Sequence, residues 1–519
     1  MFLTQPLHKG RREKPEAIAV VCGDTRLAFV EFTDRVARLG AALRALDMAP
    51  GARIGMMSFN SHRFVEYMFG VWWGGGVVNP INIRWNPKEV AYSLDDCDTR
   101  ILLVDDAFAP MVAELRTLST SLRTVVYCGD GPVPEGMLGY EVLLANSAPC
   151  DDAAHSADEL AAIMYTGGTT GRPKGVMLTH GNLYIDALGS IACLPRTAEK
   201  PAVVITTPMF HVAGCGLSIQ AMVRLAPQHV LPMFDEVAVL QAIQAARATE
   251  IFLVPTMIKR LIEHPRFAEF DLSSLDLMLY GAAPIDVSLL EQAMRALPKA
   301  GFSQAYGMTE LSPTVAVLQP RFHLPGPDRD RLLRSTGTPL PMAEIRIVDA
   351  QDHEVPTGQV GEITARGPMV MRGFWNKPKE TDDALRGGWM HTGDGGYIDA
   401  HGFLFVVDRI KDMIVSGGEN IYSAEVENAI AQIPQVLMSA VIGIPDDKWG
   451  ESVHAVIVLR AGAVLDAEAV IAHCRSEIAS YKAPRSVEFR AALPLSAAGK
   501  LQKFQLREPF WAGRSRRVN

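Results

Sequence analysis

The sequence predicts a large α/β domain, with parallel sheets flanked by helices and a β-barrel-like region, followed by a small α+β domain on a hinge. Apolar stretches of strand length alternate with amphipathic helical stretches in the first part of the chain, which is typical of parallel sheets covered by helices. After about residue 335, alternating strands between Gly- and Pro-rich turns replace this pattern. A chain of 519 residues also exceeds what one hydrophobic core usually supports, so we expect several subdomains.

Two helices and six strands account for the α/β pattern. Apolar residues at helical spacing predict an amphipathic helix over residues 32–46, and a second helical stretch covers residues 62–73. The predicted strands share a short apolar run between turns and are residues 53–59, 101–105, 160–164, 202–206, 251–254 and 275–280. Because strands and helices alternate, we expect parallel pairing.

The last third of the chain predicts two further regions. Strands of the antiparallel region are expected at residues 344–349, 362–365 and 403–407. The α+β region is predicted to contain helices at 423–433 and 467–480 and strands at 439–444 and 453–459. We place the hinge at residues 408–412, which gives domains of residues 1–408 and 409–519. The second, of about a hundred residues, has a normal size for a small domain.

Composition excludes several classes of protein. The net charge of −8 argues against a general nucleic-acid binder. Seven scattered cysteines without a CxxC pair predict reduced, mostly buried thiols in a cytoplasmic protein. The N-terminus lacks the apolar core of a signal peptide, and the longest apolar run, residues 68–78, is too short to cross a bilayer. Peripheral membrane contact and a homodimer are compatible with the sequence.

The run from Met164 to Val176 contains the chain's highest concentration of residues typical of a ligand-binding loop. It contains four glycines, three threonines and Lys174, directly after the predicted strand 160–164. Glycines allow close backbone approach, successive N–H groups form an anion-binding nest, and a lysine adds a point charge. A Gly/Thr-rich surface turn is the alternative, but a turn needs only one or two glycines. The run therefore predicts a polyphosphate loop. It is not a Walker loop, because Lys174 follows a proline and precedes a glycine.

This run closely resembles the phosphate loop of the adenylate-forming superfamily, which includes acyl-CoA synthetases, peptide-synthetase adenylation domains and luciferases. The usual form is Tyr-Thr-Ser-Gly-Thr-Thr-Gly-x-Pro-Lys-Gly, and this chain differs by having Gly167 in place of the serine, followed by Gly168. Bacterial long-chain fatty acyl members share that difference. It removes one hydroxyl, so Thr166, Thr169 and Thr170 must supply the rest of the phosphate cradle, with Lys174.

The resemblance implies functional roles for two further segments. The segment Gln304-Ala305-Tyr306-Gly307-Met308-Thr309-Glu310 is similar to the family's adenine and magnesium motif. The resemblance implies that Tyr306 flanks adenine, Thr309 contacts the α-phosphate and Glu310 holds Mg²⁺. Gly281, Ala282 and Ala283, alone only a strand-to-helix turn, would place backbone between adenine and the acyl pocket.

Pocket and ribose residues follow in the same way. His211, in Pro208–Gly214, resembles the aromatic gate of the acid pocket, although a single histidine is usually structural. Asp394 follows a tight turn and has the chemistry to accept both ribose hydroxyls. A helix-capping aspartate is the alternative. Arg409 would bind the same ribose.

The C-terminal region supplies the remaining implied residues. Gly417 and Gly418 form a second glycine turn that lines the pantetheine channel in the family, and Lys411 would be the hinge residue. Lys500, in a glycine-containing loop, corresponds by resemblance to the catalytic lysine of adenylation.

The sequence thus predicts an AMP-forming acid–CoA ligase that uses ATP, Mg²⁺ and CoA and acts through an acyl-adenylate. Glu310 with Mg²⁺, Lys174 and Lys500 would neutralise the repulsion between a carboxylate and a polyphosphate. A luciferase, a carrier-loading adenylation module and a non-catalytic nucleotide-binding regulator are the rival readings. No charged residue is obviously placed for a second charge on the acid, so an apolar acid is expected. A medium- or long-chain fatty acid comes first, and a hydroxycinnamate or other aryl acid follows closely.

Overall fold

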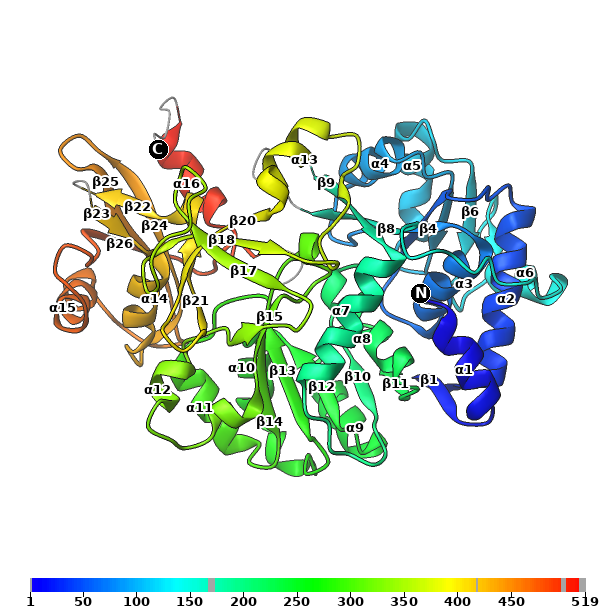
Figure 1. The fold of residues 1–519 in the computed structure, drawn as a ribbon, viewed down its shortest axis with the longest axis horizontal. Coiled ribbons are helices and arrows are strands. Elements are labelled where there is room, and N and C mark those ends of the chain that lie inside the picture. Colours follow the sequence, from blue (N-terminus) through cyan, green and yellow to red (C-terminus); the bar gives the residue numbers. More distant parts are fainter. Residues whose placement is uncertain (1, 167–172, 417–418, 496–500, 513–519) are drawn as a thin grey trace.

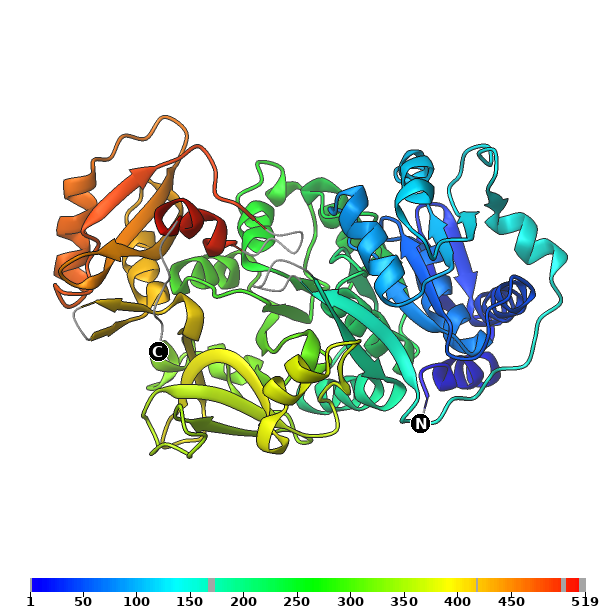
Figure 2. The same ribbon diagram turned by 90° about the horizontal axis from the view of Figure 1, so that it is seen from above.

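The computed structural model describes residues 2–166, 173–416, 419–495 and 501–512. These residues form two large sheets, a smaller antiparallel sheet and a C-terminal sheet with its own helices. Figure 1 shows the C-terminal part, in orange and red, to one side of the blue-to-green body, with the yellow antiparallel sheet between them. Figure 2 shows the same arrangement from above. The predicted large α/β part followed by a small α+β part is therefore confirmed.

The first large sheet holds the strands on both sides of the phosphate-loop segment. Among the described residues its order is β19-β9-β8-β4-β3-β5-β6-β7. The bounds are β3 Arg53–Met57, β4 Val77–Pro80, β5 Ile101–Val104, β6 Thr124–Tyr127, β7 Leu138–Gly139, β8 Leu160–Thr166, β9 Lys174–Thr179 and β19 Gly373–Phe374. The helices before residue 150 are α1 Gln5–Glu13, α2 Phe29–Ala45, α3 His62–Gly74, α4 Pro87–Asp96, α5 Val112–Leu118 and α6 Tyr140–Asn146.

The second large sheet leads to the adenine-motif segment. Its order in the described ranges is β16-β15-β14-β13-β12-β10-β11-β1-β2. The strands are β1 Ile18–Cys22, β2 Thr25–Ala28, β10 Val203–Ile205, β11 Gln228–Val230, β12 Glu250–Leu253, β13 Leu277–Gly281, β14 Gly301–Tyr306, β15 Ala316–Leu318 and β16 Thr338–Pro339. The helices are α7 His180–Cys193, α8 Val212–Val223, α9 Glu236–Ala246, α10 Pro255–Ile262, α11 Val287–Ala296 and α12 Arg329–Leu332.

The remaining elements form the antiparallel region and the C-terminal part. The antiparallel sheet has the order β17-β18-β20-β21, with β17 Glu344–Val348, β18 Gly361–Arg366, β20 Met390–Ile398, β21 Leu404–Arg409 and the adjoining helix α13 Pro378–Ala384. The C-terminal strands are β22 Ile414–Ser416, β23 Glu419–Ile421, β24 Val436–Asp446, β25 Gly450–Leu459 and β26 Ser486–Phe489. The C-terminal helices are α14 Ser423–Ala431, α15 Ala467–Glu477 and α16 Lys503–Trp511.

The predicted elements agree with the observed ones to within a few residues, but the pairing is less uniform than expected. The helix predicted at 32–46 is α2, and the strand predicted at 275–280 is β13. The cores of the two large sheets are parallel as predicted. However, β8 and β9 pair antiparallel, as do β14 and β15, so both sheets are mixed. A buried apolar run has the same pattern in either direction, so the sequence could not distinguish them.

One hydrophobic core is shared by the two large sheets, whereas the C-terminal part has hydrophobic cores of its own. One apolar cluster extends from the N-terminal helices through α7 and α8 to the antiparallel sheet. Two further clusters lie entirely within residues 414–510. Arg409 is the last residue of β21, and the predicted boundary after residue 408 stays a prediction.

Two further expectations concern thiols and membranes. All seven cysteines are free thiols, of which Cys97, Cys128, Cys215 and Cys474 are buried and the other three are partly exposed. Burial raises the pKa of the Cys215 thiol to about 12, which keeps it inert. In the described part of the chain, no helix has the length and hydrophobicity needed to span a bilayer.

Candidate active site

The predicted phosphate loop joins two paired strands near one side of the first sheet. Thr166, the last residue of β8, pairs with Lys174, the first residue of β9. The Lys174 Nζ lies 5.0 Å from the centroid of the Phe374 ring, a cation–π contact that positions the ammonium group without neutralising it. Gly167, Gly168, Thr169 and Thr170 lie outside the described residues. The structure therefore places the two ends of the loop.

A chain of three predicted residues, joined by one hydrogen bond and one ion pair, forms the best-defined part of the site. The Tyr306 hydroxyl donates to Asp394 Oδ2 at 2.8 Å, and Arg409 Nε lies 3.0 Å from Asp394 Oδ1. Asp394 and Arg409 are directly paired on β20 and β21. Burial and the neighbouring Asp394 raise the pKa of Tyr306, and Asp394 also raises the pKa of Arg409. Tyr306 therefore stays protonated and Arg409 stays charged near neutral pH.

Glu310 lies beside this chain. It belongs to the 3-10 turn Thr309–Leu311, which follows β14 and packs against β9, and only 8% of the residue is exposed. Its backbone oxygen accepts a hydrogen bond from the Met371 N–H at 2.9 Å. Glu310 is also close enough to contribute to the raised pKa of Arg409. The turn thus places a carboxylate between the phosphate-loop strand and the Tyr306–Asp394–Arg409 chain.

These residues are compatible with Mg²⁺. Within the described ranges, no cluster of three or more His, Cys, Asp and Glu side chains forms a complete metal cage. Mg²⁺ rarely needs one, because it usually takes one or two carboxylates together with substrate phosphates and water. A single buried carboxylate in a turn that packs against β9, the strand after the predicted phosphate loop, fits that pattern.

The turn predicted to face adenine requires small residues. Gly281 at the end of β13 pairs with Ala305, and a Cβ at Gly281 would lie 2.2 Å from the Ala305 backbone oxygen. Ala282 then has a φ of 64°, a left-handed conformation that is uncommon for alanine. Gln304 pairs with Tyr280 on the same two strands. Close strand contact therefore places the backbone of 281–283 beside Gln304 and Ala305.

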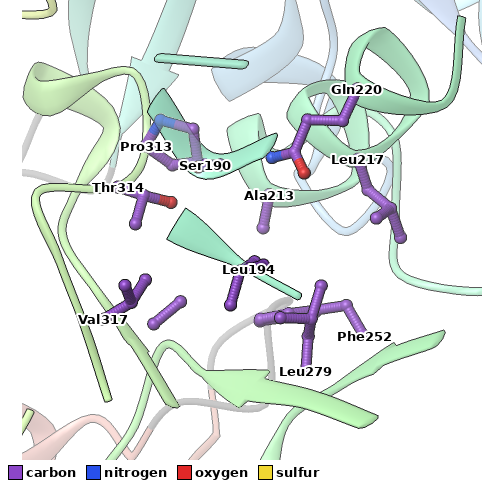
Figure 3. Close-up of a pocket in the computed structure, with 11 residues that line it drawn as sticks. Ser190, Leu194, Ala213, Leu217, Gln220, Phe252, Leu279, Pro313, Thr314 and Val317 are labelled. Carbon is purple, nitrogen blue, oxygen red and sulfur yellow. The ribbon is translucent and has the colours of Figure 1, made fainter. Parts of the chain in front are cut away.

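A cavity of about 40 Å³ lies next to this turn (Figure 3). Ala305 and Ala213 both line it, and Ala213 comes two residues after His211. Its apolar walls include Leu194, Leu217, Phe252, Leu279 and Val317. The cavity thus connects the predicted gate segment with the strand that carries Tyr306.

His211 and the C-terminal residues are placed less completely. His211 is the N-cap residue of α8, and its ring centroid lies 4.4 Å from that of Phe210. Lys411 belongs to the 3-10 turn Ile410–Asp412 directly after Arg409, and Asp412 forms an ion pair with Arg507 of α16 at 2.6 Å. Gly417, Gly418 and Lys500 lie outside the described residues.

Sequence reasoning missed three polar residues that line the cavity, namely Ser190, Gln220 and Thr314. Gln220 could have been noticed in the sequence, because Gln220 and Ser218 are the two polar residues in the apolar stretch Leu217–Val223. Ser190 and Thr314 had none, since small hydroxyl residues are common in helices and turns. Their approach to one cavity depends on how α7, α8 and the turn after Glu310 pack.

The fold and this arrangement define an adenylate-forming enzyme. The large part supplies the two strands that flank the predicted phosphate loop and a Tyr–Asp–Arg chain centred on the buried Asp394, and a small C-terminal part follows. The chain belongs to the AMP-binding enzyme family. The model of that family matches residues 7–375, and the model of the AMP-binding enzyme C-terminal domain matches residues 425–500.

Full-length relatives support this membership. A feruloyl-CoA synthase from an Amycolatopsis species is 38% identical over 501 residues, covering 96% of this chain and 97% of the relative. A medium/long-chain-fatty-acid–CoA ligase, FadD8, from Mycobacterium tuberculosis is 33% identical over 540 residues, covering 100% of this chain and 92% of the relative. The solved o-succinylbenzoate-CoA synthetase from Bacillus subtilis, in complex with its acyl-adenylate, has a TM-score of 0.85 and 30% identity, with coverage of 96% and 97%.

Proposed function

We propose that this protein is an ATP-dependent acid–CoA ligase that forms AMP and passes its acyl group through an acyl-adenylate to CoA. The reaction class is that of the AMP-forming ligases among its full-length relatives. The observation that carries the assignment is the Tyr306–Asp394–Arg409 chain beside Glu310, because it combines a ring, a charged acceptor and a carboxylate in one place. The cytoplasm is the proposed location, and a homodimer remains compatible with the fold.

The first half-reaction needs charge neutralisation. A carboxylate that approaches a polyphosphate is repelled, so cationic groups must stand where negative charge develops. Lys174 would contact the leaving phosphates, Thr166, Thr169, Thr170, Gly167 and Gly168 would cradle them, and Thr309 would contact the α-phosphate. Glu310 would hold Mg²⁺, which when bound neutralises phosphate charge. Lys500 would lie between the acid and the α-phosphorus.

The nucleoside would be held by the Tyr306–Asp394–Arg409 chain. The Asp394 carboxylate can accept both ribose hydroxyls while Arg409 and Tyr306 fix its orientation. The Tyr306 ring would pack against adenine, whose edge meets the backbone of Gly281, Ala282 and Ala283 and of Gln304 and Ala305. Holding both reactants in one site converts a bimolecular reaction into an effectively unimolecular one.

The second half-reaction needs a different arrangement of the small C-terminal part. CoA must enter while water is kept from the acyl-adenylate, and a hinged domain can meet both demands in sequence. Lys411 would be the hinge, Gly417 and Gly418 would line the thiol channel, and Lys500 would leave the site. The ion pair between Asp412 and Arg507 connects the turn after Arg409 to α16, so a rotation at this turn would move the helix with it.

Replacing Lys411 with proline is expected to slow thioester formation by about tenfold or more, which is at least ~1.4 kcal/mol of barrier, while adenylation changes little. Proline fixes φ near −65° and so removes the backbone freedom that a hinge requires. The measurement compares pyrophosphate release with acyl-CoA formation under single-turnover conditions. Lys411→Ala removes the same charge but keeps the backbone free, and it should behave like the unmodified protein. Unchanged thioester rates in Lys411→Pro would exclude the hinge role.

The substrate is proposed to be an apolar carboxylic acid, and the gate at its pocket would be His211. The cavity lined by α7 and α8 has mostly apolar walls, which is compatible with the ring of an aryl acid. A medium- or long-chain fatty acid, the first expectation from sequence, stays a prediction.

One assay tests the proposed function. Purified protein is incubated with ATP, Mg²⁺, CoA and a panel of alkanoic and aryl acids, and AMP and acyl-CoA are measured by mass spectrometry. Equal amounts of AMP and thioester are expected for at least one acid. Oxygen-dependent light, acyl transfer only to a carrier protein, or no AMP with any acid would each support a rival reading and contradict ours.

A further inference from the structure

We propose that Gln220 and Ser190 form a polar subsite in the acid pocket that accepts a neutral oxygen on the acid, in a hydroxyl, ether or keto group. The same subsite closes the pocket to long alkyl chains. This inference rests on the proposed ligase function and names the class of acid: compact, ring-containing and oxygen-substituted.

The orientation of the Gln220 amide is determined by its neighbour. Gln220 is 7% exposed on α8, and its Oε1 accepts a hydrogen bond from Arg196 Nη2 at 3.0 Å. Because a guanidinium group only donates, the amide atom that faces it must be the oxygen. The Nε2 group is therefore the one left for the cavity that Gln220 lines. Figure 3 shows this amide beside Ala213 and turned toward the cavity.

Arg196 is itself held in place. Its Nε donates to Glu250 Oε2 at 2.9 Å, and Arg224 Nη2 donates to the same oxygen at 2.9 Å. Asp276 is also close enough to act on Arg196. Arg196 thus uses Nε on Glu250, Nη1 on the Ser190 backbone oxygen and Nη2 on Gln220, so its guanidinium group is fully engaged and is not itself offered to an anionic substituent. It orients an amide, which points to a neutral acceptor on the acid.

Ser190 adds a second polar atom to the same wall. It is 2% exposed on α7, and its Oγ has no hydrogen-bond partner in the described part of the chain. Arg196 Nη1 lies 3.4 Å from the Ser190 backbone oxygen, so one arginine contacts both cavity-lining residues. Buried polar groups are rarely left unpaired, because desolvation without a partner is unfavourable. An oxygen on the bound acid would accept from Gln220 Nε2 and exchange a hydrogen bond with Ser190.

The rest of the cavity limits the shape of the acid. Leu217, Phe252 and Leu279 give it apolar walls suited to a ring. A long alkyl chain that continued past Gln220 would meet the Arg196–Glu250–Arg224 cluster and would have to displace paired charges.

The test compares kcat/KM for matched acids. The panel pairs 3-phenylpropenoate with its ring-hydroxylated and ring-methoxylated forms at the meta and para positions, and adds straight alkanoates of increasing length. The unmodified protein should prefer one oxygenated acid by roughly tenfold or more over the unsubstituted one. Gln220→Leu should remove that preference, raise activity on longer alkanoates and leave the KM for ATP unchanged. Ser190→Ala should reduce the preference partly, and it provides a second variant should Gln220→Leu not fold.

Ser218→Ala is the matched control. Ser218 is also buried on α8, but its hydroxyl donates to Gln228 at 2.6 Å and does not line the cavity. It should keep the oxygen preference. The subsite would be overturned if both Gln220→Leu and Ser190→Ala kept the full preference for the oxygenated acid. It would also be overturned if the unmodified protein were as active on long alkanoates as on the oxygenated aryl acids. Either result would leave the ligase function intact. If the unmodified protein showed no preference for oxygenated acids, the polar groups of the cavity would be bound only by water, and the subsite would likewise be overturned. No AMP from any acid would overturn the ligase function and this inference together.

Discussion

Replacing Lys500 with alanine is expected to abolish acid-dependent pyrophosphate release while sparing thioester formation from supplied acyl-adenylate. The reason is electrostatic: this lysine would neutralise charge that develops between the acid and the α-phosphorus, and only the first half-reaction creates that charge. Removing a single group that stabilises developing charge typically costs about 10²–10³-fold in rate, and a full positive charge should be at the upper end of this range. Pyrophosphate release and acyl-CoA formation from chemically prepared acyl-adenylate are measured separately.

Two outcomes would contradict this assignment of Lys500. Equal loss of both half-reactions would mean that the residue does not act in adenylation alone, and normal adenylation would remove it from the mechanism. Lys299→Ala serves as a control for charge, since Lys299 is an exposed lysine for which no role in the site is proposed. It should leave both rates unchanged.

Replacing Asp394 with asparagine is expected to raise the KM for ATP by about 10- to 100-fold. Hydrogen bonds to charged groups contribute ~1.5–3 kcal/mol each, and an amide can no longer accept from both ribose hydroxyls while facing Arg409. Asp394 is also buried, whereas its partner Arg409 is partly exposed, and the substitution leaves the Arg409 charge without its nearest counter-ion. Steady-state kinetics with varied ATP, together with the melting temperature, would show whether affinity or only stability is lost.

Two companion variants separate these effects. Tyr306→Phe removes the hydroxyl that donates to Asp394 but keeps the ring and the carboxylate, so its KM for ATP should rise only a few-fold, in line with one neutral donor. Asp399→Asn disrupts another Asp–Arg pair, that with Arg331, just beyond the end of β20. It should lower stability without changing the KM. If Asp394→Asn matched Asp399→Asn in both measurements, Asp394 would be a structural residue.

Local pattern explains how much of the fold was predictable. Strands such as β12 and β13 are short apolar runs between turns, and their positions follow from burial alone. The antiparallel pairing of β8 with β9 was not predicted. A strand that is buried on both faces is apolar throughout, so its sequence does not indicate whether the neighbouring strand runs parallel or antiparallel to it. The cavity wall was missed for a related reason. Gln220 and Ser190 belong to different helices, and only the packing of α7 against α8 gives them one arginine in common.

The amino-acid sequence alone determined the reaction chemistry of this protein. Glycine density, hydroxyls and a lysine within Met164–Val176 predict a polyphosphate ligand without any knowledge of the fold, because those properties belong to the residues and their spacing. Only the tertiary structure decided which distant groups meet. Tyr306 and Asp394 are 88 residues apart yet share a hydrogen bond. The amide of Gln220 acquires a direction only through Arg196 and Glu250. The distances between such residues and the orientations of their side chains result from tertiary packing, so they cannot be predicted from a single sequence.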